Sequence, residues 1–421
     1  MAGLDVQIEA KVKLENKSQI TMLIIIGLLL FVAVSLVLYL TKSAVKKQTE
    51  KSIKSVHETA IEAAPINDFV VKCLDKLARD SVVLLGKQGG YIYKSQNGMS
   101  ADYPDDGDGL FFLKYGNSNV AYNILPPSRG TSRDKFYADV PKYPWEFFPY
   151  INSVSTDEFF QGYFGRSTLP PLNSSEGSGP TMEMQIKTYI ENNMDSCANF
   201  DVFKSQGFEI SSNKSNASVI IGKNDVSIGL DYPVYITNIQ TKESAELNEF
   251  STKVNARLKE LYFFTKSLIE NDVSDVTFNI NAAGNNKDSF KAALIRNIPS
   301  RGQITNDAIV KITDEKSLIG GRPFEYVFAR KNRAPALYYI KNTDNLVFDD
   351  NHQLTETDLL GNSLQKNAID PDEDPTTFLI TDLSGNGLSH LPKVDRNEIR
   401  LRVQASDGKL SDYQDIVIKR R

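Results

Sequence analysis

The sequence predicts an α+β protein with a single N-terminal transmembrane helix, a helical stalk, a mixed α+β ectodomain and a C-terminal β-sandwich. Three observations support this prediction. The run from Ile20 to Leu40 contains no charged residue, apolar residues recur at helical spacing from Ile66 onward, and short strand-like runs separated by turns follow Pro335. The predicted parts are a polar leader at 1–18, the membrane helix at 19–41, the stalk at 42–64, the ectodomain at 65–331 and the sandwich at 332–421.

The composition limits the function before any motif is considered. The 421 residues carry a net charge of −5, which argues against a nucleic-acid partner because such proteins need a clustered basic surface. The chain has three histidines, and it contains no HExxH metal motif, no Walker loop, no Gly-x-Ser-x-Gly elbow and no dinucleotide fingerprint. We therefore expect no enzymatic activity.

The uncharged run Ile20–Leu40 is long enough to cross a membrane. Its 21 residues would span roughly 31 Å as a helix, which is about one hydrocarbon core. A cleaved secretion signal has a shorter apolar region followed by a small-residue site, and no such site follows here. Lysines flank both ends of the run, so charge alone does not fix the orientation. We expect a single-pass protein of the cell membrane with its bulk extracellular, because three candidate glycosylation sequons follow the run, at Asn173, Asn213 and Asn216.

The ectodomain alternates helical and strand-like segments. Asn67 can begin a helix with one apolar face after Pro65, and Gly86 can end it. Gly89-Gly90 then predicts a turn, because the Walker spacing of a phosphate loop is missing. Residues 95–180 look irregular. Further predicted elements are helices at 181–197 and 249–270, and strands at 217–223, 226–237, 276–281, 308–313, 324–330, 377–381, 398–405 and 415–419.

The two cysteines, Cys73 and Cys197, lie on the first two of these helices. In an oxidising exterior an even pair favours a disulfide, and two separate buried thiols are the alternative. On the chain-entropy model a bridge closing a loop of roughly 125 residues would stabilise the fold by about 4–5 kcal/mol.

The C-terminal segment carries three motifs in order, within "RKNRAPALYYI", "IDPDEDPTTFLI" and "QASDGKLSDYQDIVI". They resemble the immunoglobulin- or cadherin-like β-sandwich repeats of secreted adhesins, which implies a small two-sheet sandwich over about residues 332–420. In that family the acidic motifs can hold calcium, and Glu373 stands where the family has glycine. Calcium is therefore the one cofactor to expect, with a solvated acidic turn as the alternative. The residues that match the family's ligands are Asp370, Asp372, Asp374 and Asp407.

Three other stretches resemble membrane-anchored surface proteins of small symbiotic archaea of the DPANN type. They are "SQITMLIIIG", "KCLDKLARDSVVLLGKQGGYIY" and "LPPLNSSEGSGPTMEMQIKTYIENNMDSC", and the similarity spans residues 17 to about 330. It implies an extracytoplasmic fold with a Cys73–Cys197 bridge and no particular activity. The leader also resembles that of archaeal type IV pilins, which is cleaved before a glutamine, so the Ser18–Gln19 bond is a candidate processing site. Leu23 stands where pilins have glutamate.

These observations predict a non-enzymatic, membrane-anchored surface protein that binds other cells, envelope proteins or glycans. The alternative is a pilin-like filament subunit, a homo-oligomer in which the hydrophobic N-terminal helices pack as a core. A third hypothesis is an envelope sensor or a subunit of a secretion complex. An intact leader favours the anchor, whereas a mature chain that begins at Gln19 favours the filament.

Overall fold

The computed structural model describes residues 63–101, 112–126, 164–300, 303–337, 346–360 and 368–421. These residues form a mixed α+β protein with several β-sheets and few helices, as the sequence predicts. By its contacts the chain divides into two compact units. Of the described residues, the first unit contains 63–69, 200–214 and 232–250, and the second contains all the others. The predicted domain boundaries stay predictions.

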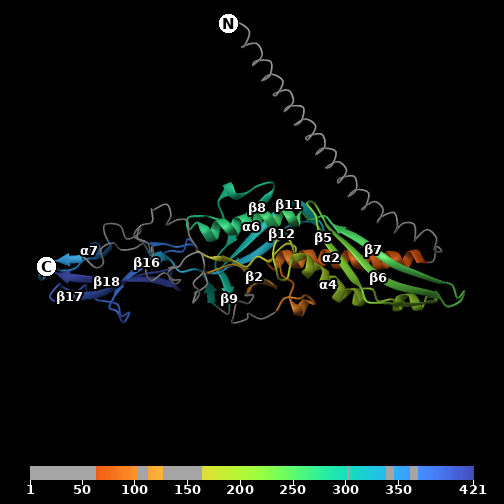
Figure 1. Ribbon diagram of the computed structural model, residues 1–421, viewed down its shortest axis with the longest axis horizontal. Helices are drawn as coiled ribbons and strands as arrows, with labels where there is room; N and C mark the ends of the chain where they lie inside the picture. The colour runs from red at the N-terminus through yellow and green to blue at the C-terminus, as the bar shows by residue number, and fades with distance from the viewer. Residues whose placement is uncertain (1–62, 102–111, 127–163, 301–302, 338–345, 361–367) are drawn as a thin grey trace, which may run out of the picture. The chain divides into compact units, whose positions relative to one another are not determined.

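Many of the elements of the described residues are labelled in Figure 1. The helices are α2 (Ala64–Lys87), α4 (Met182–Cys197), α5 (Asp201–Lys204), α6 (Leu258–Ser274) and α7 (Glu356–Leu360), with the 3-10 turns η2 (Lys94–Gln96) and η3 (Ala283–Asn285). The strands are β1 (Phe112–Tyr115), β2 (Ser118–Leu125), β3 (Arg166–Ser167), β4 (Phe208–Ser212), β5 (Asn216–Ile221), β6 (Val226–Asn238), β7 (Ser244–Val254), β8 (Phe290–Ile295), β9 (Ile298–Ser300), β10 (Gln303–Thr305), β11 (Ala308–Ile319), β12 (Arg322–Arg330), β13 (Ala336–Leu337), β14 (Leu346–Phe348), β15 (Ala368–Ile369), β16 (Thr377–Thr381), β17 (Glu398–Ser406) and β18 (Ser411–Arg420).

The predicted membrane helix at 19–41 and the candidate cleavage site between Ser18 and Gln19 lie outside the described residues, as does the stalk except for its last two positions. None of the helices in the described ranges combines the length and the apolar character that a membrane span requires. The anchor and the processing site therefore stay predictions.

Helix α2 starts three residues before the predicted start at Asn67. Pro65 lies in its first turn, where a missing amide donor costs no hydrogen bond. Gly86 does not end the helix: it is helical, and an added Cβ there would lie 2.5 Å from the carbonyl oxygen of Glu325. The glycine lets strand β12 pass close to α2. The predicted turn follows, with φ of 69° at Gly89 and 90° at Gly90.

The central sheet of the second unit has the order β1-β2-β12-β11-β8, with β3 also paired to β2. Neighbouring strands are antiparallel except β12 and β2, which are parallel. Helix α6 lies along this sheet (Figure 1). Strands β11 and β12 confirm two predictions, but the prediction that 95–180 is irregular was wrong at β1 and β2. The strand predicted at 276–281 is a series of turns, and residues 249–254, predicted helical, belong to β7.

A second sheet has the order β4-β6-β5, with β7 also paired to β6. Helix α4 packs on β5, and two of its glutamates bind the strand's amide groups. Glu191 accepts from the backbone N–H of Ala217 at 2.9 Å, and Glu183 from that of Ile221 at 3.2 Å. These contacts satisfy donors that a bare sheet edge would expose.

The C-terminal strands form a sandwich-like pair of sheets. One sheet has the order β14-β18-β17-β16, and the two-stranded sheet β13-β15 packs on β17 and β18. Alternate residues of β17 point into a core, since Leu401, Val403 and Ala405 are at most 3% exposed. This alternation is what the sequence displays. The strand predicted at 377–381 coincides with β16, and those predicted at 398–405 and 415–419 lie within β17 and β18.

Candidate functional site

The predicted disulfide is present. Cys73 of α2 and Cys197 of α4 are bonded, with their Cα atoms 5.7 Å apart. Both belong to the second unit, and the bridge joins positions 124 residues apart in the chain. The alternative, two separate buried thiols, was therefore wrong.

The stretch "LGKQGGYIY" forms part of a buried polar network. Gln185 of α4 is fully buried, and its side-chain oxygen accepts from the backbone N–H of Ile92 at 2.7 Å and from the Ser100 hydroxyl at 2.9 Å. Its amide nitrogen donates to the Gly90 carbonyl at 2.9 Å. An added Cβ at Gly90 would lie 2.6 Å from Pro170. Gly90 of this stretch is therefore explained by packing and hydrogen bonding within the fold.

The three sequon asparagines differ in their surroundings. Asn213, after β4, and Asn216, on β5, are exposed, and Lys187 donates to the side-chain oxygen of Asn216 at 3.1 Å. Asn173 is half-buried, and its side-chain oxygen accepts from the Ser175 hydroxyl at 2.6 Å. Glycosylation at these positions stays a prediction.

The acidic turn, Asp370–Asp374, is a tight loop between β15 and β16. One oxygen of Asp370 accepts from the backbone N–H groups of Asp372 at 2.7 Å and Asp374 at 3.2 Å. Glu373 has a φ of 60°, in the left-handed region that favours glycine. A glycine would adopt this backbone conformation without the strain that Glu373 carries.

Arg333 anchors this turn in the interior. Its side chain is fully buried, and its guanidinium lies 2.8 Å from an oxygen of Asp372, whose other oxygen accepts from the Arg333 backbone N–H at 2.6 Å. The guanidinium also donates to the carbonyl oxygens of Phe164 at 3.3 Å, Asp272 at 3.2 Å and Pro371 at 2.8 Å. One side chain therefore ties the acidic turn to α6 and to the segment before β3.

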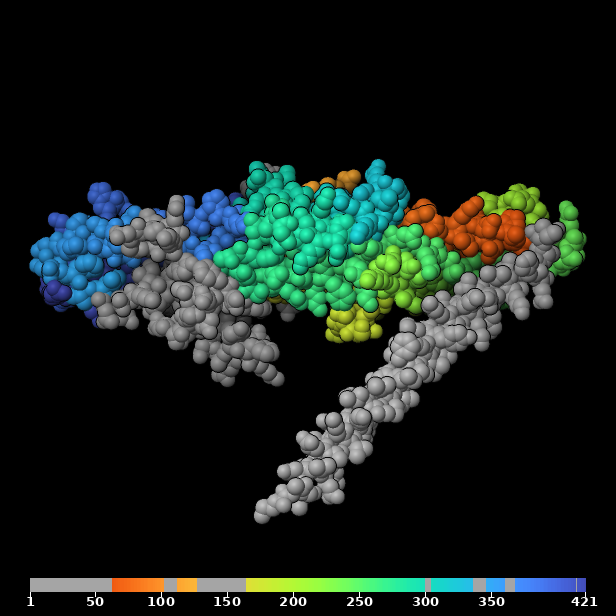
Figure 2. Space-filling model, turned by 90° about the horizontal axis from the view of Figure 1, so that it is seen from above, coloured from red at the N-terminus to blue at the C-terminus, as the bar shows by residue number. Residues whose placement is uncertain are grey.

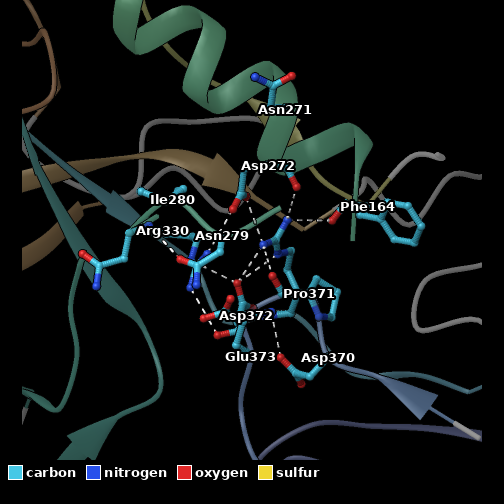
Figure 3. Close-up of polar contacts among 12 residues, drawn as sticks. Phe164, Asn271, Asp272, Asn279, Ile280, Arg330, Asp370, Pro371, Asp372 and Glu373 are labelled. Carbon is cyan, nitrogen blue, oxygen red and sulfur yellow. Dashed lines mark hydrogen bonds and ion pairs between the residues drawn. The ribbon is translucent and has the colours of Figure 1, made fainter. Parts of the chain in front are cut away.

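A second buried arginine completes the charge balance. Arg330, at the end of β12, lies 3.1 Å from Asp372 and 3.0 Å from Asp272, and Arg333 lies 3.0 Å from the other oxygen of Asp272. Figure 3 shows Asp272 at the end of α6 on one side of this network and Asp372 on the other. Although burial opposes ionisation, Arg333 and Arg330 hold the pKa of Asp372 below its ordinary value. The result is a neutral set of two cations and two anions.

Carboxylates also fix the linker between β12 and β13. Asp307 accepts from the Lys331 ammonium group at 3.0 Å and from the backbone N–H of Asn332 at 2.9 Å. The side-chain amide of Asn332 donates to Asp407 at 2.7 Å. Since the next residue, Arg333, is held by Asp372, successive residues of the linker are bonded to acidic side chains that are distant in sequence.

Among the described residues, three buried oxygens of the acidic turn and the linker have neither a hydrogen-bond partner nor an ion-pair partner. They belong to Asp370, Asp374 and Asn332, whose second side-chain oxygen or nitrogen is bonded. Burial, with the neighbouring Asp372 and Asp374 carboxylates, raises the pKa of Asp370 to about 8. Burial and Asp372 also raise the pKa of Asp374, and Arg296 partly offsets this effect. The turn thus contains more carboxylate than its arginines neutralise.

The predicted calcium ligands fit calcium only in part. Asp370 and Asp374 each offer an unpartnered oxygen of the kind that calcium takes. Asp372 instead binds arginine through both oxygens, and one oxygen of Asp407 accepts from the backbone N–H groups of two residues in its own turn. Across the described ranges, no three His, Cys, Asp or Glu side chains are grouped so that they could hold a metal ion. Calcium stays a prediction, with Asn332 as an additional candidate ligand.

Sequence reasoning missed most of the residues that surround the turn. Asp272, Asp307 and Arg296 carry no local motif, and only the fold brings them to Arg330, to the linker residue Asn332 and to Asp374, respectively. Arg333 falls within the stretch "RKNRAPALYYI", but nothing in that stretch indicates that its side chain is buried against Asp372. A comparison with models of known protein families and with curated proteins finds no match to this sequence.

Proposed function

We propose that this chain is a non-enzymatic, membrane-anchored surface protein that binds other cells or components of the cell envelope. The observation that carries the proposal is the Cys73–Cys197 disulfide, because such bridges persist mainly outside the reducing cytosol. It follows an uncharged run of 21 residues, a length that suits an anchor. The resemblance to archaeal surface proteins is consistent with this location.

The adhesive element of the proposal is the outward face of the sheet β14-β18-β17-β16. Arg402 lies 3.8 Å over the ring of Tyr413 and is paired with Asp415 at 2.6 Å. Leu379, in the row of Tyr413, is 50% exposed. Arginine and tyrosine are enriched at protein interfaces, and tyrosine also stacks on sugars. The binding partner is accordingly an envelope protein or a surface glycan.

The experiment uses fluorescent vesicles that display the full-length chain, mixed with cells of the same and of neighbouring species. We expect these vesicles to bind above the level of empty vesicles. The variant Leu379→Lys should reduce binding, whereas Leu318→Lys, which places the same charge at a leucine of β11 that is 57% exposed, should not. Binding no stronger than that of empty vesicles would refute the proposal.

Calcium at the acidic turn is part of the proposed function. The unpartnered buried oxygens of Asp370, Asp374 and Asn332 support it, since a divalent cation would satisfy them and offset the surplus carboxylate charge. The ion would strengthen the attachment of the turn to the linker, whose Asn332 is already bonded to Asp407. A melting temperature of the full-length chain that rises with millimolar calcium tests this part.

A filament subunit is the second candidate function, and a sequence observation favours it. Gln19 follows Ser18 directly before the uncharged run, at the place where the pilin-like leader would be cleaved. Mass spectrometry of the mature N-terminus separates the two functions. A chain that begins at Gln19 supports the filament, and an intact leader supports the anchor.

A further inference from the structure

Three arginines contact the acidic turn, and their exposure differs. Arg330 and Arg333 have side chains that are 3% and 0% exposed, whereas the side chain of Arg296 is 32% exposed. The first two cannot leave without abandoning buried carboxylates, which is costly. Arg296 alone of these three can turn toward water at a low cost.

Arg296 makes its contacts from the connection between β8 and β9. One guanidinium nitrogen donates to Asp374 at 2.8 Å, and another lies 3.3 Å from a Glu373 oxygen and donates to the Asp372 carbonyl. The next residue, Asn297, has a φ of 58°, so the chain turns sharply at this point. Residues 258–300, green to teal in Figure 2, form part of the surface in that view.

The oxygens that a cation would gain are buried, and two of them belong to the acidic turn and one to the linker. Asp370 is 7% exposed and Asn332 is 8% exposed, and each has one oxygen without a hydrogen-bond partner. Asp374 links Arg296 to these oxygens, because one of its oxygens binds Arg296 and the other is buried and unpartnered. A divalent ion bound here would repel the guanidinium and compete with it for Asp374.

We propose that Arg296 is a tethered cation that competes with calcium for Asp374 and so sets the calcium affinity of the acidic turn. The inference rests on the proposed calcium site and adds a regulator that lies outside the sandwich motifs. Arg296 neutralises Asp374 when calcium is scarce, and it turns to solvent when calcium binds. The turn then responds only to calcium concentrations high enough to displace the guanidinium.

The test is calorimetric titration of the chelator-treated full-length chain in detergent with calcium alone. The variant Arg296→Gln removes the competing charge and should bind calcium about two- to fivefold more tightly, as expected for the loss of a partly exposed ion pair near the ion. Arg296→Lys keeps the charge and should stay close to the wild type. Arg400→Gln is the matched control, because Arg400 is also paired with an acid, Glu398 at 2.7 Å, but lies on β17.

Each outcome is distinct. Equal calcium affinity in the wild type and in Arg296→Gln would overturn the tethered cation and leave calcium binding intact. An equal gain of calcium affinity in Arg400→Gln would also overturn the tethered cation, since the gain would then follow from the lower net positive charge and not from the position of Arg296. If neither the wild type nor Arg296→Gln binds millimolar calcium, the calcium part of the proposed function fails together with this inference. Circular dichroism of each variant checks that the fold is unchanged.

Discussion

Replacing Asp372 by asparagine tests the buried network most sharply. The substitution keeps the shape of the side chain and removes its charge. Asp372 lies 2.8 Å from Arg333 and 3.1 Å from Arg330, and it accepts the backbone N–H of Arg333. The variant leaves two buried guanidinium groups with Asp272 as the only carboxylate of the network.

The expected loss of stability in Asp372→Asn follows from the burial of the two arginines. The two arginines are 0% and 3% exposed, so water does not screen the unbalanced charge. Removing one partner of such a set destabilises a protein by about 3–5 kcal/mol. This is a large share of a typical stability of about 5–15 kcal/mol. The control Asp415→Asn breaks an Asp–Arg pair on β17 and β18 whose aspartate is 42% exposed, and it should cost at most about 1 kcal/mol.

Urea unfolding of the full-length chain, followed by circular dichroism, measures the difference. With an m-value of about 3 kcal/mol per molar, Asp372→Asn should lower the midpoint of the transition that includes the C-terminal strands by at least about 1 M. The control should shift that midpoint by no more than about 0.3 M. Equal, small shifts in both variants would refute the claim that this network holds the acidic turn in place.

Three further predictions concern other parts of the fold. Replacing both cysteines of the disulfide by alanine should destabilise the chain by about 2–5 kcal/mol in thermal unfolding; an unchanged melting temperature would contradict this. Glu373→Gly should stabilise it by about 0.5–1 kcal/mol, because relief of the left-handed backbone outweighs a half-exposed ion pair with Arg296; a lower melting temperature would show the opposite balance. Burial opposes ionisation of Asp314, but hydrogen bonds from Arg257 and Ser317 lower its pKa, so its stabilisation is present above about pH 4 and is lost as the pH falls through the lowered pKa. Asp314→Asn should therefore cost about 3–5 kcal/mol at pH 7 and progressively less in acid, and a cost that did not depend on pH would count against it.

The sequence predicted those elements in which one face is buried and the other is exposed to solvent. The stripe of Met182, Ile186, Ile190 and Met194 revealed α4, and alternation revealed β17. Strand β2 was missed because its last six residues are all buried, which leaves no alternation to detect. For α4, β17 and β2, the sequence pattern reflects which residues pack in the core and not the intrinsic propensity of those residues for helix or strand.

The candidate site was predictable only where a motif carried it. The resemblance located the acidic residues, but it could not show that Asp372 binds arginines. Asp272 and Arg333 are 61 residues apart and meet only after α6 and β12 have packed. Charged residues are rarely buried, so nothing in their local sequence indicates that these are. Buried ion networks of this kind follow from the fold and not from composition or spacing.

The most direct test of the surface assignment is whether intact cells expose the chain. A small epitope tag placed after Arg421 can be probed with an antibody before and after the membrane is permeabilised. The account predicts strong labelling of intact cells, with little increase on permeabilisation, because the C-terminal bulk lies outside. Labelling that occurs only after permeabilisation would contradict the assignment, and the adhesive function with it.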